Sequence, residues 1–217
     1  MGNIERKTKE KEIRKEDIIQ SAERVFFSKG YEAATMDDVA REAQFSKRTL
    51  YMYFNSKEQI YFEIMTRGYR LFLDMLKSDL AVINNQNPLE GLKALFYKFY
   101  AFSKEYPRHF QAIMEYQNKE LDFSQRIPSQ STEECYRLGE EILHLLIGLL
   151  EEGIARGVFL PELKPDRTAL VLWSCALGIF NTADKKEKYL KNYYNLSGEE
   201  LLYESYSLIL GSILKHD

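Results

Sequence analysis

Apolar residues recur at helical spacing through most of the chain, and no segment alternates with the two-residue period of a strand. The first predicted helix runs from about residue 15 to 29 and ends at a glycine. Two short helices and a long fourth one then follow within residues 35–83. Later helices are predicted at about 88–105, 107–120, 131–156, 165–190 and 198–215. We therefore expect an all-α fold, with a small three-helix head and a larger helical body.

Helix-start signals divide residues 35–57 into three parts. Thr35 with Asp38 fits a capping box, in which a hydroxyl and a carboxylate each accept a backbone N–H near the start of a helix. Ser46 precedes a second helical run, and Ser56 with Gln59 fits another box. With a break at residues 44–45, this layout is typical of a helix-turn-helix, whose second helix enters the DNA major groove.

Polar and aromatic residues occupy the positions that the apolar pattern leaves facing outward. We expect Lys47, Arg48 and Thr49 to meet base edges at the start of the second short helix. Hydroxyl and ammonium groups around them are predicted to contact phosphates. These phosphate contacts are Thr35, Ser46, Tyr51, Tyr53 and Lys57. A charged but non-binding helical surface is the alternative, and the combined spacing of caps, small residues and aromatics argues against it.

Residues 17–61 resemble the N-terminal domain of TetR-type transcriptional regulators. The resemblance is carried by Ile18, Ala22, Phe26, Gly30, Tyr31, Ala34, Thr35, Val39, Ala40, Ala43, Ser46, Thr49, Leu50, Tyr51, Phe54, Ser56, Lys57 and Glu58. It departs from the family at Gln44, where the family usually has a glycine that accepts a left-handed backbone. The resemblance implies a three-helix helix-turn-helix DNA-binding head and a larger helical ligand-binding and dimerisation body.

Three segments are predicted: a charged N-terminal arm at 1–14, the helix-turn-helix domain at 15–61, and the effector-binding and dimerisation domain at 62–217. The arm has two structural alternatives, a frayed tail or an extension of the first helix. It also has two functional ones, since such an arm can reach a neighbouring groove or can simply be solvated.

Composition narrows the class of protein. The 217 residues are 45% hydrophobic, and no apolar run is long enough to span a membrane. Two cysteines without metal-ligand spacing predict no zinc site, no cofactor and a reducing, cytoplasmic setting. The net charge is −3, but residues 1–57 carry 12 basic and 10 acidic residues, whereas 58–217 carry 18 and 23. DNA affinity must therefore come from a few well-placed cations.

The last two long helices carry apolar stripes, and the resemblance implies that they pair with their copies in a homodimer. The residues predicted at this interface are Leu170, Trp173, Leu177, Tyr206, Leu210 and Ile213. Symmetry supports a dimer, because two recognition helices meet successive major grooves about 34–36 Å apart on a palindromic operator. The alternative is that the stripes complete the core of the single chain.

The middle helices are rich in aromatic residues, and the resemblance implies a pocket for a small, hydrophobic effector among them. The residues predicted to line it are Tyr69, Phe72, Phe99, Phe110, Met114, Leu143, Ile147 and Phe180. For any single aromatic residue, a place in the core is the alternative. His144 lies in an apolar run and is interpreted as a core histidine.

These observations predict a ligand-responsive repressor that a small, largely apolar effector releases from double-stranded operator DNA. An activator or architectural DNA-binding protein without an effector is the first alternative. An enzyme is the second, and the chain shows no nucleophile–histidine–acid order, metal spacing or glycine-rich phosphate loop. Its adjacent carboxylates, such as Glu140 and Glu141, point about 100° apart on a helix and share no site.

Overall fold

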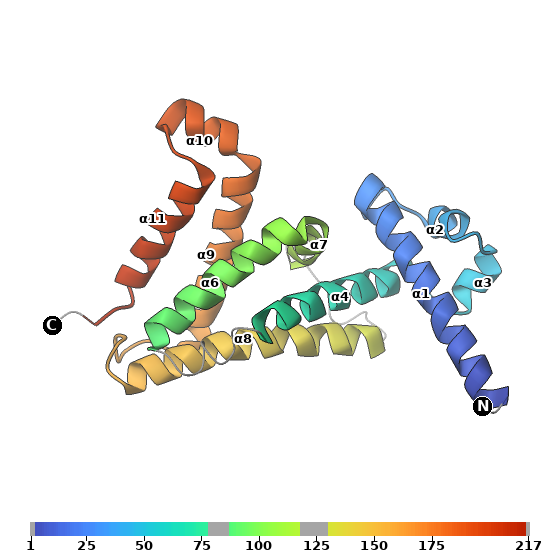
Figure 1. Ribbon diagram of the computed structural model, residues 1–217, viewed down its shortest axis with the longest axis horizontal. Helices are drawn as coiled ribbons and strands as arrows, with labels where there is room; N and C mark the ends of the chain where they lie inside the picture. The colour runs from blue at the N-terminus through green and yellow to red at the C-terminus, as the bar shows by residue number, and fades with distance from the viewer. Residues whose placement is uncertain (1–2, 78–86, 118–129, 216–217) are drawn as a thin grey trace. The chain divides into compact units, whose positions relative to one another are not determined.

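The computed structural model describes residues 3–77, 87–117 and 130–215 (Figure 1). The regular elements of these residues are helices, and their only strand-like pairing is an isolated bridge between Phe159 and Leu214. The all-α prediction is confirmed. The helices are α1 (Asn3–Lys29), α2 (Met36–Glu42), α3 (Lys47–Tyr51), α4 (Lys57–Lys77), α6 (Pro88–Glu105), α7 (Pro107–Gln117), α8 (Gln130–Ala155), α9 (Pro165–Lys185), α10 (Glu187–Tyr194) and α11 (Gly198–Gly211).

The chain forms two compact units. The first comprises Met1–Tyr69 and Gln111–Leu138, and the second comprises Arg70–Phe110 and Gly139–Asp217. Helices α4, α7 and α8 contribute residues to both units. The predicted ends of the fourth helix near residue 83 and of the 107–120 helix lie outside the described residues.

In the first unit, α1 packs against α2 and α4 around a core of fully buried apolar side chains. This core includes Ile18, Ala22, Val39, Leu50, Phe54, Ile60 and Ile64. Helix α1 begins at Asn3, so the N-terminal segment extends the first helix as one of the two structural alternatives predicted. It ends at Lys29, and the next residue, Gly30, has a φ of 80°, a left-handed conformation that glycine adopts without steric cost.

Charged side chains fasten α1 to α4 in the first unit. Arg67 of α4 binds both Glu16 and Glu23 of α1. Glu63, one turn earlier, accepts hydrogen bonds from Lys15 of α1 and from Ser131 of α8. A single carboxylate thus joins three helices, which fixes the direction in which α4 leaves the three-helix head.

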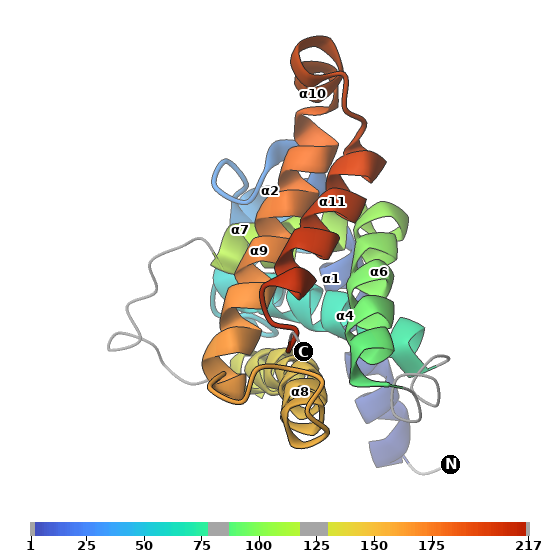
Figure 2. The ribbon, with the colours of Figure 1, turned by 90° about the vertical axis from the view of Figure 1, so that its left-hand side faces the viewer.

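In the second unit, α9 and α11 lie side by side and α10 covers the end of the pair (Figure 2). A single helix was predicted over 165–190, but the structure ends α9 at Lys185 and begins α10 at Glu187. The predicted 198–215 helix ends at Gly211. The residues after it turn back instead, because Leu160 N–H donates to Ile213 and Lys215 N–H donates to Val158.

Candidate DNA-binding surface and body cavity

The turn between α2 and α3 is held by backbone hydrogen bonds around a left-handed residue. Gln44 has a φ of 57°, the conformation for which the resembling family uses glycine. Phe45 N–H donates to the Ala40 carbonyl at 3.0 Å, and Gln44 N–H donates to Arg41. The turn therefore has the family's geometry despite the departure at Gln44.

Both short helices begin at the residues that the capping signals predict. The Thr35 hydroxyl accepts from Asp38 N–H at 3.1 Å, and the Asp38 carboxylate accepts from Thr35 N–H at the same distance. Lys29, with its ammonium 2.6 Å from Asp38, and the bonds from Thr35 lower the pKa of Asp38 to about 2. At α3, the Ser46 hydroxyl accepts from Thr49 N–H at 3.1 Å. Thr35 and Ser46 are thus structural caps, and Thr49 is the residue of α3 that the Ser46 cap binds.

Helix α3 is anchored by the fully buried Leu50 and presents its other side chains to solvent. Lys47 pairs with Asp37 of α2 at 2.8 Å, and this hydrogen bond raises the pKa of Lys47. Arg48 is exposed and makes no salt bridge with another described residue. Its guanidinium is therefore available for a base edge, whereas Lys47 must release or share Asp37 before it can bind DNA.

The exposed surface around α3 also includes Tyr51 and Tyr53, which were predicted, and Met52, which was not. Tyr51 is 44% exposed and Tyr53 is half-buried. Met52, not included among the predicted contacts, is 74% exposed, which is unusual for a large apolar side chain. Because it follows Arg48 by four residues, the two share one face of the turn. The spacing of four residues from Arg48 is the signal in the sequence that indicates Met52 as a further contact.

Lys57 is placed differently from the phosphate contact predicted for it. Its ammonium donates to three backbone carbonyls, those of Tyr31 at 2.9 Å and of Glu32 and Ala34 at 3.2 Å. It also lies 4.5 Å from the centre of the Tyr31 ring, a cation–π distance. All three N–H donors are used within the protein. The contacts describe a residue that ties α4 to the loop after α1.

The second capping box of this region forms only in part. Gln59 N–H is 3.3 Å from the Ser56 hydroxyl, as predicted. The Gln59 side chain, however, accepts from Asn55 N–H rather than from Ser56 N–H. The side chain of Gln59 therefore binds the backbone of Asn55, one residue before the Ser56 partner that the capping-box pattern predicts.

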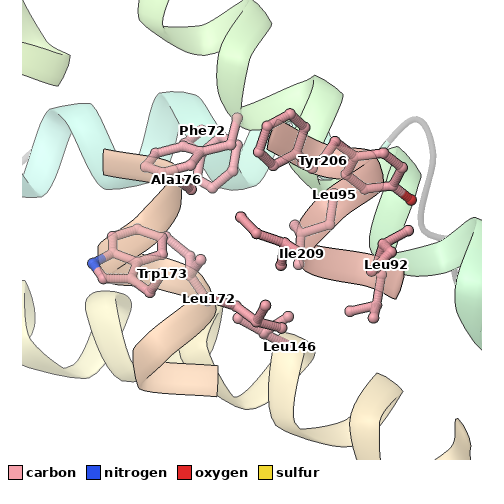
Figure 3. Close-up of a pocket in the computed structure, with 13 residues that line it drawn as sticks. Phe72, Leu92, Leu95, Leu146, Leu172, Trp173, Ala176, Tyr206 and Ile209 are labelled. Atoms are coloured by element: carbon pink, nitrogen blue, oxygen red, sulfur yellow. The ribbon is translucent and has the colours of Figure 1, made fainter. Parts of the chain in front are cut away.

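The second unit contains an apolar cavity among α4, α6, α8, α9 and α11 (Figure 3). It spans about 610 Å³, a volume that includes space open to solvent. None of the described residues that line it is charged. They are Phe72, Leu92, Leu95, Phe96, Phe99, Ile142, Leu146, Leu172, Trp173, Ala176, Tyr206, Ile209 and Leu210. Such a lining suits an apolar molecule.

Of the eight residues predicted to line a pocket, Phe72 and Phe99 line this cavity. Phe110 and Phe180 pack behind Phe99 instead, with ring centres 5.6 and 5.3 Å from it. On α8 the predicted positions, Leu143 and Ile147, are each one residue beyond Ile142 and Leu146, which do line it. Tyr69 belongs to the first unit and is buried there, and Met114 belongs to the same unit.

The predicted interface residues fall mostly on the inner side of α9 and α11. Trp173, Tyr206 and Leu210 line the cavity, and Ile213 is buried. Trp173 also stacks on Phe99 with ring centres 4.6 Å apart. For these four residues the structure therefore supports the alternative that the stripes complete the core. Only Leu170 is exposed, and Leu177 is half-buried.

A different set of residues forms the outer side of these two helices. On α9 it combines exposed Leu170 and Val171 with Ser174 and Gly178, and on α11 it combines Tyr203 with Leu208, which is 76% exposed. We call these six residues the outer face.

His144 of α8 is exposed, so its interpretation as a core histidine is wrong.

One polar group in the cavity wall is unusual. Tyr206 is 8% exposed, and its hydroxyl is buried without a hydrogen-bond partner among the described residues. Burial, with a smaller contribution from the Glu90 charge, raises the pKa of Tyr206. The neutral phenol is therefore the stable form, and its ring rather than its hydroxyl forms the wall.

As for membranes, no helix in the described ranges has the length and apolar character needed to cross one.

Comparison with known proteins agrees with this geometry. Residues 18–64 match the family model described as bacterial regulatory proteins, tetR family. The HTH-type transcriptional repressor KstR2 of Mycolicibacterium smegmatis is 32% identical over 155 residues, which cover 70% of this chain and 71% of KstR2.

Two solved structures share the fold at lower identity. The regulator FadR from Bacillus subtilis, solved with stearoyl-CoA, is 18% identical with a TM-score of 0.64, covering 91% of this chain and 98% of FadR. AibR, solved with isovaleryl coenzyme A and operator DNA, is 19% identical with a TM-score of 0.63, covering 90% and 97%. With the match to KstR2 extending well beyond the head, the chain belongs to the tetR family of bacterial regulatory proteins and is a DNA-binding regulator of transcription.

Proposed function

We propose that the protein is a homodimeric repressor that leaves a palindromic operator when a small, largely apolar molecule occupies the cavity of its body. One observation carries the proposal. The same chain holds a capped recognition helix with an exposed arginine and a cavity whose described lining carries no charge. In this proposal residues 15–61 read DNA and residues 62–217 bind the effector and the second subunit.

The exposed side of α3 supports direct readout of bases. Arg48 can donate two parallel hydrogen bonds to the N7 and O6 acceptors of a guanine. Met52, on the same face, offers an apolar surface suited to the methyl group of a thymine. Lys47, Thr49, Tyr51 and Tyr53 then position the helix on the duplex, together with the caps Thr35 and Ser46 at its edge.

The cavity supports a small apolar effector over a polar one. Burying a charged ligand against uncharged walls would cost its hydration without replacing it. KstR2 is a repressor, and the solved neighbours bind stearoyl-CoA and isovaleryl-CoA. Molecules with an apolar acyl part are therefore the first probes. An activator or architectural protein without an effector would have no use for this cavity.

Helix α4 offers a route from cavity to head. It carries Lys57, which is bonded to the loop after α1, and Phe72, which lines the cavity. A ligand that prefers one position of α4 over another shifts the equilibrium between DNA-binding and released states by that difference in affinity.

The outer face supports the homodimer. Its large apolar residues are exposed, while Ser174 and Gly178 let a second helix approach closely. A two-fold dimer places the same surface of each subunit in contact and presents two α3 helices to the two halves of a palindrome.

The test is selection of bound duplexes from a random library, followed by titration of the selected duplex. We expect a two-fold symmetric sequence with half-sites one helical turn apart, released by an acyl-CoA of matching chain length. Arg48→Ala should relax the preference at a guanine and Met52→Ala at a thymine. Selection that yields no preferred sequence, or a double Lys47→Ala, Arg48→Ala variant that binds as tightly and selectively as wild type, would refute the assignment.

A further inference from the structure

The N-terminal turns of α1 form a helix without a core to pack on. The first buried residue of α1 is Ile18, whereas the side chains of residues 5–14 are all exposed. An isolated helix of this length is only marginally stable in water. These turns therefore present a surface whose charges face solvent on every side.

The cations of these turns are not evenly distributed. Lys7, Lys11 and Arg14 follow the spacing i, i+4 and i+7, which places them on one face of the helix. None of the three makes a salt bridge with another described residue. The acidic residue that borders this face, Glu10, is already bound by Arg6 at 3.0 Å.

The opposite side of the same turns has mixed charge. Glu5, Lys9 and Glu12 lie there, so this side has no excess of cations. Attraction for an anion is thus confined to the face of Lys7, Lys11 and Arg14, which we call the basic face. Lys9 provides a lysine on the same turns that lies off it.

The basic face continues towards the junction of α3 and α4. Lys15 follows Lys11 by one turn, and its ammonium lies 5.8 Å from the ring centre of Phe54, which follows the last residue of α3 by three positions. The same ammonium binds Glu63 of α4. Figure 1 shows that the backbone of α1 continues beyond the level of α3 towards the N-terminus. Ile18, which follows Lys11 by seven residues, is fully buried, so the basic face continues the side of α1 that packs on the core of the head.

We propose that the basic face binds the phosphate backbone of DNA beside the half-site that α3 reads. This rests on the proposed function, because it adds a contact to the DNA complex. From Lys7 to Arg14 the helix rises about 10 Å, the axial length of about three phosphates on one strand. The contact carries no sequence information, and it raises affinity by releasing counterions.

The experiment is a salt titration of the full-length protein on the duplex selected by the wild type, read by fluorescence anisotropy. Each phosphate neutralised contributes about 0.9 to the slope of log K against log salt concentration. We expect Lys11→Gln to reduce that slope by about 0.9 per bound subunit, and the triple variant with Lys7→Gln and Arg14→Gln by about 2.7. The matched control Lys9→Gln should leave it unchanged.

Glutamine has nearly the helix propensity of lysine, so circular dichroism should show equal helix content in all four proteins. The triple variant should also select the same sequence as wild type. Equal slopes for Lys11→Gln and Lys9→Gln, whether both fall or neither does, would overturn the basic face as a DNA contact. Failure of the wild type to bind any duplex would overturn the proposed function as well, which separates the two outcomes.

Discussion

Phe159 occupies the space that a side chain at position 153 would need. A Cβ atom on Gly153 would lie 2.0 Å from Cδ2 of the Phe159 ring, and that ring is fully buried. This contact packs the loop after α8 against α8 itself. The backbone of Phe159 also pairs with Leu214, which holds the same loop against the C-terminal segment.

Gly153→Ala should therefore destabilise the protein although it places a better helix former in α8. We expect a loss of about 1–3 kcal/mol in the free energy of unfolding, typical of overpacking in a core. The matched control is Gly148→Ala on the same helix, where a Cβ meets nothing within 4 Å. It should gain up to about 1 kcal/mol. Urea denaturation measures both, and equal stability of the two variants would refute the packing described for Phe159.

The left-handed backbone at Gln44 predicts a stabilising substitution. Glycine removes the steric cost of a φ of 57°, which is about 1 kcal/mol for a residue with a Cβ. Gln44→Gly should raise the melting temperature by a few degrees without changing the selected DNA sequence. Arg41→Gly, inside α2, is the control and should lower it, because glycine costs about 1 kcal/mol in a helix. A similar loss for both variants would contradict the conformation of the turn.

The capping box at Thr35 predicts a dependence of stability on pH. The pKa of Asp38 falls from 3.8 to about 2 on folding, so the folded state favours the ionised form. This contribution is complete above about pH 5 and is lost as the pH falls towards 2. The stability difference between wild type and Asp38→Asn should therefore shrink over that range. A difference that stays constant from pH 5 to pH 2 would show that the carboxylate is not held as described.

If the proposed homodimer forms through the outer face, it should depend on the exposed apolar residues of that face. Leu208→Glu places a charge on this face and should make the protein monomeric in sedimentation equilibrium, where the wild type is expected to be a dimer, because burying that charge is costly. Tyr193→Glu is the control, since Tyr193 is equally exposed but lies on α10. Dissociation by both variants, or by neither, would place the interface elsewhere.

Features set by neighbouring residues were predictable from the sequence. The caps at Thr35, Ser46 and Ser197 and the end of α1 before Gly30 follow from local chemistry, and the structure has all of them. The break at Lys186 was missed because neither proline nor glycine marks it. The helical spacing simply continues through the break.

Features set by distant residues were not predictable. Helical spacing allows either Ile142 with Leu146 or Leu143 with Ile147 to face a cavity, and only the packing of the other helices decides between the two pairs. Trp173 and Tyr206 were assigned to an interface for the same reason. The role of Lys57 depends on carbonyl groups 23 to 26 residues earlier in the chain, which no local pattern indicates.

The most direct test of the central claim is whether filling the cavity removes the response to ligand while leaving DNA binding intact. Ala176→Leu adds volume inside the cavity, and Ala155→Leu adds the same volume at an exposed position of α8. The measurement is the Kd for the selected duplex with and without the acyl-CoA that releases the wild type. We predict that Ala155→Leu responds as wild type does and that Ala176→Leu binds DNA but no longer responds. Release of Ala176→Leu at the wild-type ligand concentration would contradict the claim that the cavity is the effector site.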